Sequence, residues 1–67
     1  DYGRLVALIR ALPEGYRRIL ELKFVEEESN RSIARRLGLK ESTVSTRIQR
    51  GRKLLLDAME REGYCYG

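Results

Sequence analysis

The sequence predicts an all-α fold, a single four-helix domain over residues 1–67 that contains a helix-turn-helix without a wing. Strand signals are nearly absent, because the chain has no alternating run of Val, Ile and Thr and no Asn-Gly or Asp-Gly turn. Apolar residues instead recur at spacings of three and four, as on the buried face of an amphipathic helix. A chain of 67 residues accommodates one domain with a small core.

The first two helices are expected at residues 2–11 and 13–25. Proline disfavours a helical conformation in the residue before it, so Pro13 separates them, and it suits the first position of the second helix. Glutamates at positions 26–28 place negative charge where the helix dipole disfavours it, so the second helix should end near Val25 and an acidic loop should follow. The apolar faces comprise Leu5, Leu8, Ile9 and Leu12, then Tyr16, Ile19, Leu20 and Phe24.

Two further helices are expected at residues 29–37 and 42–62. Ser29 can cap the third helix through its side-chain oxygen, and Ser42 or Thr43 can cap the fourth. Gly38 stands where a chain leaving a helix commonly needs positive φ. Inside the fourth helix, Gly51 costs roughly 1 kcal/mol relative to alanine, which is either compensated by the close approach of another backbone or simply tolerated. The core positions are Ile33, Ala34 and Leu37, then Val44, Ile48, Leu55 and Met59.

Positive charge is concentrated in residues 29–56. This segment holds eight basic residues and one acid, although the net charge of the chain is only +4. A basic run ordinarily forms a solvated face of the protein. It could also bind the acidic surface of another protein. Because Lys and Arg side chains that neutralise phosphates release counterions, so concentrated a patch favours nucleic acid.

A helix-turn-helix is expected at about residues 31–50, where a short helix, a turn with glycine and a second helix follow one another. The second helix of this motif enters the major groove of DNA. Arginine can bond guanine, glutamine adenine, and serine or threonine either edge, while backbone amides at the helix start can hold a phosphate. The same side chains could merely solvate an exposed helix, but their coincidence with the turn and the charge favours recognition. The predicted contacts are Ser42, Ser45, Thr46, Arg47, Gln49 and Arg50, with Arg52 and Lys53 suited to phosphates.

Other classes of function find little support in the composition. The chain has no His and a single Cys, Cys65, so we expect no metal site, no internal disulfide, no cofactor and no role for that cysteine. The acids lie at the ends or on exposed faces, which argues against an enzyme. The apolar runs are shorter than the roughly 20 residues of a membrane span, so a cytoplasmic setting is expected. Residue 1 is Asp rather than Met, as in a segment cut from a longer protein.

Several stretches follow an order typical of one known family. They are Leu12-Pro13-Glu14, residues 19–25, Ser29, Ile33-Ala34, Leu37-Gly38-Leu39, Thr43-Val44, Arg47-Ile48 and Arg50-Gly51-Arg52-Lys53-Leu54. This order resembles region 4 of bacterial RNA polymerase sigma factors, most closely those of the extracytoplasmic-function type, over about Leu5 to Ala58.

The resemblance implies recognition of the minus-35 promoter element within a sigma factor that directs RNA polymerase to initiate transcription. It implies that the positions matching the predicted contacts approach bases or backbone, and that Thr43 meets a phosphate. It also implies docking on the flap of the polymerase beta subunit and sequestration by an anti-sigma protein.

The sequence departs from the family pattern in two places. Glu27 and Glu28 stand where glycine and an apolar residue are usual, so the turn before the third helix is expected to differ. Lys40 stands where Ser, Thr or Pro is common and cannot accept as a cap, so the fourth helix is expected to begin at Ser42 or Thr43. A cation there opposes the helix dipole. A phosphate would relieve this, which makes Lys40 a candidate backbone contact.

Two other interpretations stay open. The DNA-binding output domain of LuxR-type response regulators shares Ser29-Asn30, Ile33-Ala34 and residues 41–44, although the Leu-Pro-Glu start and the Arg-Gly-Arg-Lys run favour a sigma factor. A protein-interaction module could bind polymerase or an anti-sigma protein without reading DNA, which would leave the basic patch vestigial.

Overall fold

The structure is a computed structural model that describes residues 2–61 and 63, and within them it contains helices and no strand. The elements are α1 (Tyr2–Arg10), α2 (Glu14–Leu20), the π-helical turn η1 (Glu21–Val25), α3 (Asn30–Leu37) and α4 (Glu41–Arg61). The predicted all-α, four-helix fold is therefore confirmed. None of the described helices is both long and apolar enough to cross a membrane.

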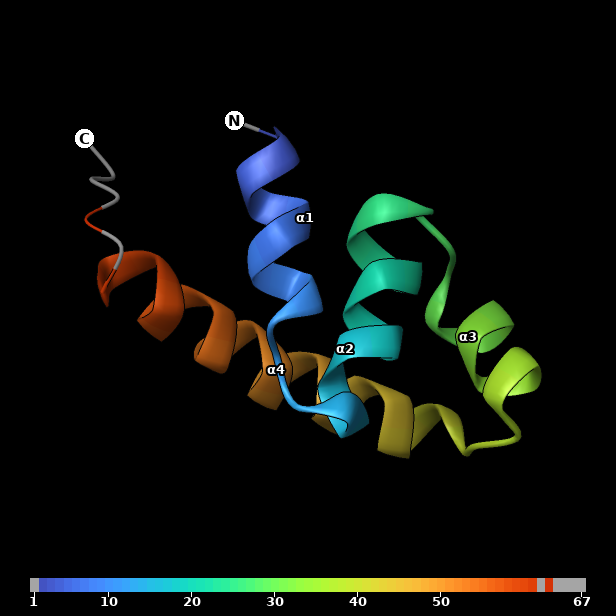
Figure 1. The fold of residues 1–67 in the computed structure, drawn as a ribbon. Coiled ribbons are helices and arrows are strands. Elements are labelled where there is room, and N and C mark those ends of the chain that lie inside the picture. The colour runs from blue at the N-terminus through green and yellow to red at the C-terminus, as the bar shows by residue number, and fades with distance from the viewer. Residues whose placement is uncertain (1, 62, 64–67) are drawn as a thin grey trace.

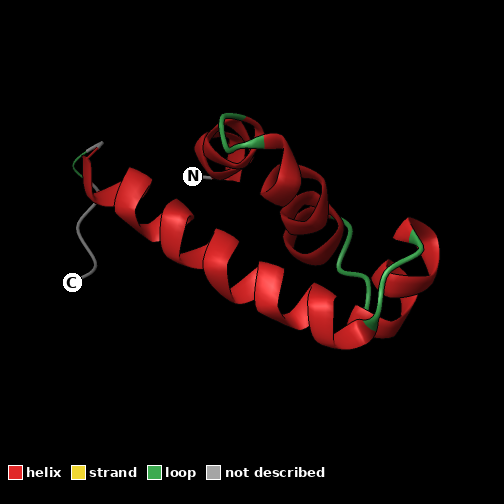
Figure 2. Cartoon of the chain, turned by 90° about the horizontal axis from the view of Figure 1, so that it is seen from below, coloured by secondary structure: helices red, strands yellow, loops and turns green. Residues whose placement is uncertain are grey.

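The long helix α4 supports the other elements. Its 21 residues correspond to about 30 Å of helix, most of the 35 Å longest dimension of the molecule. The elements α1, α2 with η1, and α3 all lie on one side of it (Figure 1). Seen from below, α4 alone crosses the near face (Figure 2). One side of α4 is thus committed to the core, and the opposite side stays open.

The core consists of two apolar clusters that lie along α4. One cluster joins α2, η1, α3 and α4 through Ile19, Leu22, Ile33, Ala34 and Val44. The other joins α1, α2 and α4 through Ile9, Leu12, Leu20 and Leu55. Ile48 packs against both. Because the first cluster fixes α3 against the start of α4, it sets the geometry of the helix-turn-helix.

The second helix is continuous from Glu14 to Val25, but its last turn is wider than an α-turn. The N–H of Glu26 donates to the carbonyl of Glu21 at 3.0 Å, five residues back. The predicted end of this helix is confirmed. Its predicted start at Pro13 is wrong by one residue, because Pro13 has ψ of 146° and acts as the N-cap. Its carbonyl accepts from the N–H groups of Tyr16 and Arg17.

The turn between η1 and α3 closes like a glycine-terminated helix. Glu27 has φ of +56°, and the N–H of Glu28 donates to the carbonyl of Leu22 at 2.9 Å. This bond reaches six residues back, one more than the bond of the Schellman motif, in which the left-handed position is usually glycine. Glu27 therefore adopts a left-handed conformation that glycine favours, at the position where the resemblance implies glycine.

The caps of α3 match the prediction, whereas the start of α4 does not. The Ser29 side chain accepts from the N–H of Ser32 at 3.1 Å, and Gly38 is left-handed with φ of +67°. Helix α4 begins at Glu41, with the Lys40 carbonyl accepting from Val44 at 3.0 Å. The prediction that Ser42 or Thr43 caps α4 is therefore wrong, because both already lie in its first turn. Of the expected range 42–62, residue 62 lies outside the described residues.

Gly51 marks the crossing of α4 and α2. It is buried, and a Cβ built on it would lie 3.2 Å from Leu20 Cδ1, from Leu20 Cγ and from Tyr16 Cβ. The close neighbours are side chains of α2 rather than a second backbone. The absence of a side chain lets α2 and α4 approach closely, which compensates the low helix propensity of glycine.

Candidate nucleic-acid interface

The open face of α4 carries most of the predicted contact residues. Val44 is fully buried and Ile48 is half-buried, so these two residues mark the side of α4 that faces the core. Because each residue of a helix is turned by 100° from the one before, the direction of every other side chain of α4 follows from theirs. Ser42, Thr46, Gln49, Arg50 and Lys53 fall on the side opposite Val44 and Ile48, and all five are exposed. Their spacing of three and four residues makes one continuous stripe along about three turns of helix.

A surface hollow of about 340 Å³ lies along this stripe. It is lined by Ser42, Thr43, Thr46, Arg47 and Arg50. Three hydroxyl groups and two guanidinium groups therefore converge on one hollow. The arginines and the Ser42 and Thr43 hydroxyls can donate hydrogen bonds, and the two arginines carry positive charge, so the hollow is suited to phosphate oxygens and to the acceptor atoms of base edges.

The cations of this face carry no carboxylate partners among the described residues. The ion pairs of that part of the chain are Arg10 with Glu21, Arg18 with Glu26 and Arg36 with Glu28. None involves a residue from Lys40 to Lys53. Because no internal ion pair has to be broken, these charges are available to an anionic ligand such as the backbone of DNA.

The Thr46 hydroxyl is already used inside the helix. Its Oγ1 donates to the Ser42 carbonyl at 3.0 Å, one turn earlier. Its donated hydrogen is therefore occupied, while its oxygen lone pairs and methyl group stay available. Thr46 can accept from the amino groups of adenine or cytosine or touch the methyl group of thymine. It is less suited to guanine, which offers acceptors in the major groove.

The first turn of α4 points free backbone donors at the same region. The first N–H groups of a helix have no partner within it, and Lys40, directly before α4, has no side-chain acceptor with which to cap them. Helix N-termini of this kind bind phosphate. Lys40 is exposed and stands beside these amides, so its ammonium group can reach the same phosphate.

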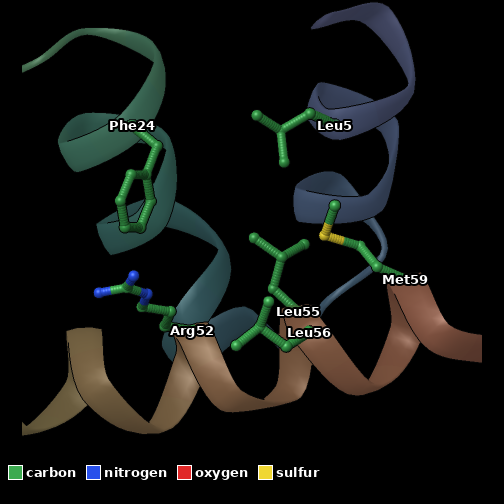
Figure 3. A pocket seen from close by; sticks show the side chains of 6 residues that line it. All are labelled: Leu5, Phe24, Arg52, Leu55, Leu56 and Met59. Atoms are coloured by element: carbon green, nitrogen blue, oxygen red, sulfur yellow. The ribbon is translucent and has the colours of Figure 1, made fainter. Parts of the chain in front are cut away.

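Two predicted contacts, Ser45 and Arg52, lie on the flank of α4 away from both the stripe and the hollow. Ser45 is exposed on the other flank of α4, one residue past the buried Val44. Arg52 lies on that flank too, and lines a groove with Leu5, Phe24, Leu55, Leu56 and Met59 (Figure 3). The predicted set therefore divides between two sides of one helix. Helical spacing reveals the division, since Arg52 precedes Leu55 and Leu56 by three and four residues.

A polar cluster at the start of α3 was not predicted from the sequence. Glu28 Oε1 accepts from Ser32 Oγ at 2.8 Å and from Arg36 Nε at 3.0 Å. These hydrogen bonds lower the pKa of Glu28, that from Ser32 most. The expectation that the acids lie at the ends or on exposed faces is thus wrong for Glu28, whose side chain is only 14% exposed. The spacing of four residues between Glu28, Ser32 and Arg36 was the available signal.

A comparison with family models matches residues 2–55 to the family described as sigma-70, region 4. The match covers α1 to α3 and α4 as far as Leu55. It includes the hollow and the polar cluster at the start of α3. No curated protein and no solved structure matches the chain.

Proposed function

The chain belongs to the sigma-70 region 4 family, a family of DNA-binding domains rather than enzymes, and from this premise we propose that it reads the minus-35 promoter element as part of a sigma factor. The observation that carries the proposal is the hollow of hydroxyl and guanidinium groups on the open face of α4. The family match also favours a sigma factor over the LuxR-type output domain.

We propose that the predicted contacts divide into base readers and phosphate binders. Ser42, Thr46, Gln49 and Arg50 lie on the outermost face of α4 and approach the base edges. Arg50 bonds guanine in a bidentate manner and Gln49 bonds adenine. Thr43 and Arg47 also line the hollow. With Lys40 and Lys53 they bind phosphates, and the amides of the first turn share one of these. Ser45 lies on the flank and is assigned a backbone contact.

We propose that the partners are promoter DNA and RNA polymerase. The family implies interaction with both, and we extend it to the flap of the polymerase beta subunit and to an anti-sigma protein. These steps occur in the cytoplasm, where the polymerase and its template are. The extracytoplasmic-function type is proposed on the residue order alone.

The proposal is tested by titrating the chain, with and without polymerase core, against duplexes selected from a random library. Binding should weaken steeply with salt, with a log-log slope near −0.9 for each phosphate neutralised. Arg50→Gln should cost about 1–3 kcal/mol and relax the preference at one base pair, whereas Arg47→Gln should weaken all duplexes and lower the slope by about 0.9.

Arg17→Gln is the matched control, because Arg17 lies on α2 outside the basic segment and its loss removes the same charge. Binding that ignores salt and is insensitive to Arg47→Ala would overturn the DNA proposal. Retained binding to polymerase core in that case would support the protein-interaction module instead.

A further inference from the structure

Thr46 lies on the outermost face of α4 with its hydroxyl hydrogen already used. Its side chain is exposed and lines the hollow together with Ser42, Thr43, Arg47 and Arg50. Its Oγ1 donates to the Ser42 carbonyl at 3.0 Å. The hydroxyl groups of Ser42 and Thr43 donate to no group in the part of the chain that the structure describes. Thr46 therefore differs from the other two hydroxyl residues of the hollow in what it can offer a ligand.

We propose that Thr46 is a specificity-determining residue that faces an A·T base pair. Its oxygen accepts a hydrogen bond from the amino group of adenine, and its methyl group packs against the methyl group of thymine. The inference rests on the proposed function, since it assumes that the open face of α4 lies in the major groove of DNA. It deepens that function by naming the kind of base pair that one residue selects and the base, guanine, that the residue disfavours.

The hydrogen bond inside α4 limits Thr46 to accepting. A hydroxyl group has one hydrogen to donate and two lone pairs with which to accept. Because the hydrogen of Thr46 is bonded to the Ser42 carbonyl, Thr46 can donate to a base only after this bond is broken. That loss disfavours a donated contact by about two- to tenfold. An accepted hydrogen bond requires no such change.

The same hydrogen bond fixes where the methyl group of Thr46 lies. Threonine in a helix divides between two χ1 rotamers, because its Oγ1 can bond a carbonyl one turn back. The bond to the Ser42 carbonyl selects one of them, so the oxygen and the methyl group keep set directions. A side chain ordered in advance loses little further rotamer freedom when it contacts a base pair.

An A·T pair matches both of these groups. In the major groove adenine presents an amino donor and thymine a methyl group, whereas guanine presents two acceptors and cytosine an amino donor. On a G·C pair the Thr46 oxygen would either face the guanine acceptors or accept from cytosine with no methyl group to pack against. An amino donor and a methyl group occur together only on A·T. The chemistry of Thr46 therefore favours A·T over G·C.

The position of Thr46 next to Arg50 indicates where this pair lies. The two residues are one turn apart on the open face of α4, which is a rise of about 6 Å, and successive base pairs are about 3.4 Å apart. The A·T pair should thus lie within about two base pairs of the guanine that Arg50 bonds. Arg50 donates where Thr46 accepts, so the two residues read opposite hydrogen-bond patterns.

The test uses the 67-residue chain and the duplex selected from the random library, altered by one group at a time. Uracil in place of each thymine removes a methyl group, and purine in place of each adenine removes an amino group. For wild type, both alterations should weaken binding about two- to tenfold at one A·T pair near the guanine that depends on Arg50. A duplex with G·C at this position should bind about tenfold less tightly.

Two variants separate the two contacts. Thr46→Ser keeps the oxygen and its bond one turn back but lacks the methyl group, so uracil should no longer weaken binding at this pair, while purine still should. Thr46→Val keeps a methyl group but lacks the oxygen, so it should show the reverse. Both variants should fold, since Thr46 is exposed and belongs to neither core cluster. Thr43→Ser is the matched control, because it removes the same methyl group from a residue assigned to a phosphate. It should keep both losses.

Uracil and purine losses of the same size in wild type and in both variants would overturn the inference. So would an equal weakening of all duplexes by Thr46→Val, which would indicate a phosphate contact. A preference of wild type for G·C at this position that Thr46→Val abolishes would also overturn it, because the internal bond would then break on binding.

Failure of the proposed function gives a different result. In that case no duplex is selected, or Arg50→Gln relaxes the preference at no base pair, and the inference falls with the function. Selective binding that depends on Arg50 but whose base preferences do not change in the Thr46 variants would leave the proposed function standing and contradict this inference alone.

Discussion

Glu27 holds a backbone conformation that its side chain disfavours. Its φ of +56° is left-handed, which costs a residue with a Cβ about 1–2 kcal/mol. Glycine adopts it freely but loses about 0.4–1 kcal/mol more chain entropy on folding. We therefore expect Glu27→Gly to raise the free energy of unfolding by up to about 1 kcal/mol, as measured by urea denaturation. Glu27→Ala retains the Cβ and is the control. An equal gain in both variants would attribute the effect to lost charge repulsion among residues 26–28.

Glu28 makes stability depend on pH in the acid range. Hydrogen bonds from Ser32 and Arg36 lower its pKa in the folded chain. A carboxyl whose pKa is lowered on folding contributes stability above its unfolded pKa, and this is lost as pH falls through the folded pKa. Glu28→Gln should therefore lower the urea midpoint at pH 7, and the difference from wild type should shrink below about pH 4.

The control for Glu28 is Glu60→Gln, an exposed residue of α4 that removes the same charge. It should change the midpoint little at either pH. A deficit in Glu28→Gln that is equally large at pH 7 and pH 3 would show that packing, rather than the ionised carboxylate, accounts for the loss.

At the scale of elements, two helix glycines differ in what surrounds them. A Cβ on Gly15 would meet nothing within 4 Å, whereas one on Gly51 would lie 3.2 Å from Leu20 and Tyr16. Alanine gains up to about 1 kcal/mol over glycine in a helix, but overpacking costs about 1–3 kcal/mol. Gly15→Ala should thus stabilise by about 0.5–1 kcal/mol, and Gly51→Ala should be neutral or destabilising by up to about 2 kcal/mol. Equal gains in thermal unfolding would refute the close crossing of α2 and α4.

The helices were predictable because their signals are local. Apolar spacing, Pro13, Ser29 and Gly38 placed four helices within one or two residues of their observed bounds. The start of α4 was not predictable in this way. Lys40 is the residue before the helix, and only its backbone carbonyl takes part, by accepting from the N–H of Val44. Every residue has such a carbonyl, so the sequence carries no signal for it. The π-turn at Glu21–Val25 likewise has no local signal. It adjoins the hydrogen bond from Glu28 to Leu22, which reaches beyond the helix itself.

The candidate site was predictable as a set of residues but not as a surface. Composition groups Arg50 and Arg52 in one basic run, and only their angular separation on α4 divides them. The hollow and the groove could therefore not be predicted from the sequence. Their positions depend on which side of α4 faces the core, and the buried residues Val44, Gly51 and Leu55 identify that side in the structure. Charge counts along a sequence cannot make this distinction, because it depends on which neighbours a helix packs against.

At the scale of the whole molecule, a small core coexists with a strongly basic segment. Eight cations and one acid occupy residues 29–56, and self-repulsion of this kind opposes the compact state. A polyanion that binds only the folded chain stabilises it, by about 2.7 kcal/mol at a hundredfold excess over Kd. For a domain of this size each kcal/mol shifts Tm by about 4–8 °C. Saturating duplex should therefore raise Tm by more than about 10 °C at low salt.

The rise in Tm caused by the duplex should depend on the residues of the open face of α4. Raising the salt weakens binding by counterion release, so at a fixed duplex concentration the rise in Tm should shrink. In Arg50→Gln the rise should be smaller than in wild type, whereas in Arg17→Gln, which removes the same charge on α2, it should be preserved. Thermal unfolding followed by circular dichroism measures all three. A rise of the same size in Arg50→Gln and Arg17→Gln would mean that the duplex responds to net charge alone, and that the hollow contributes no specific contact.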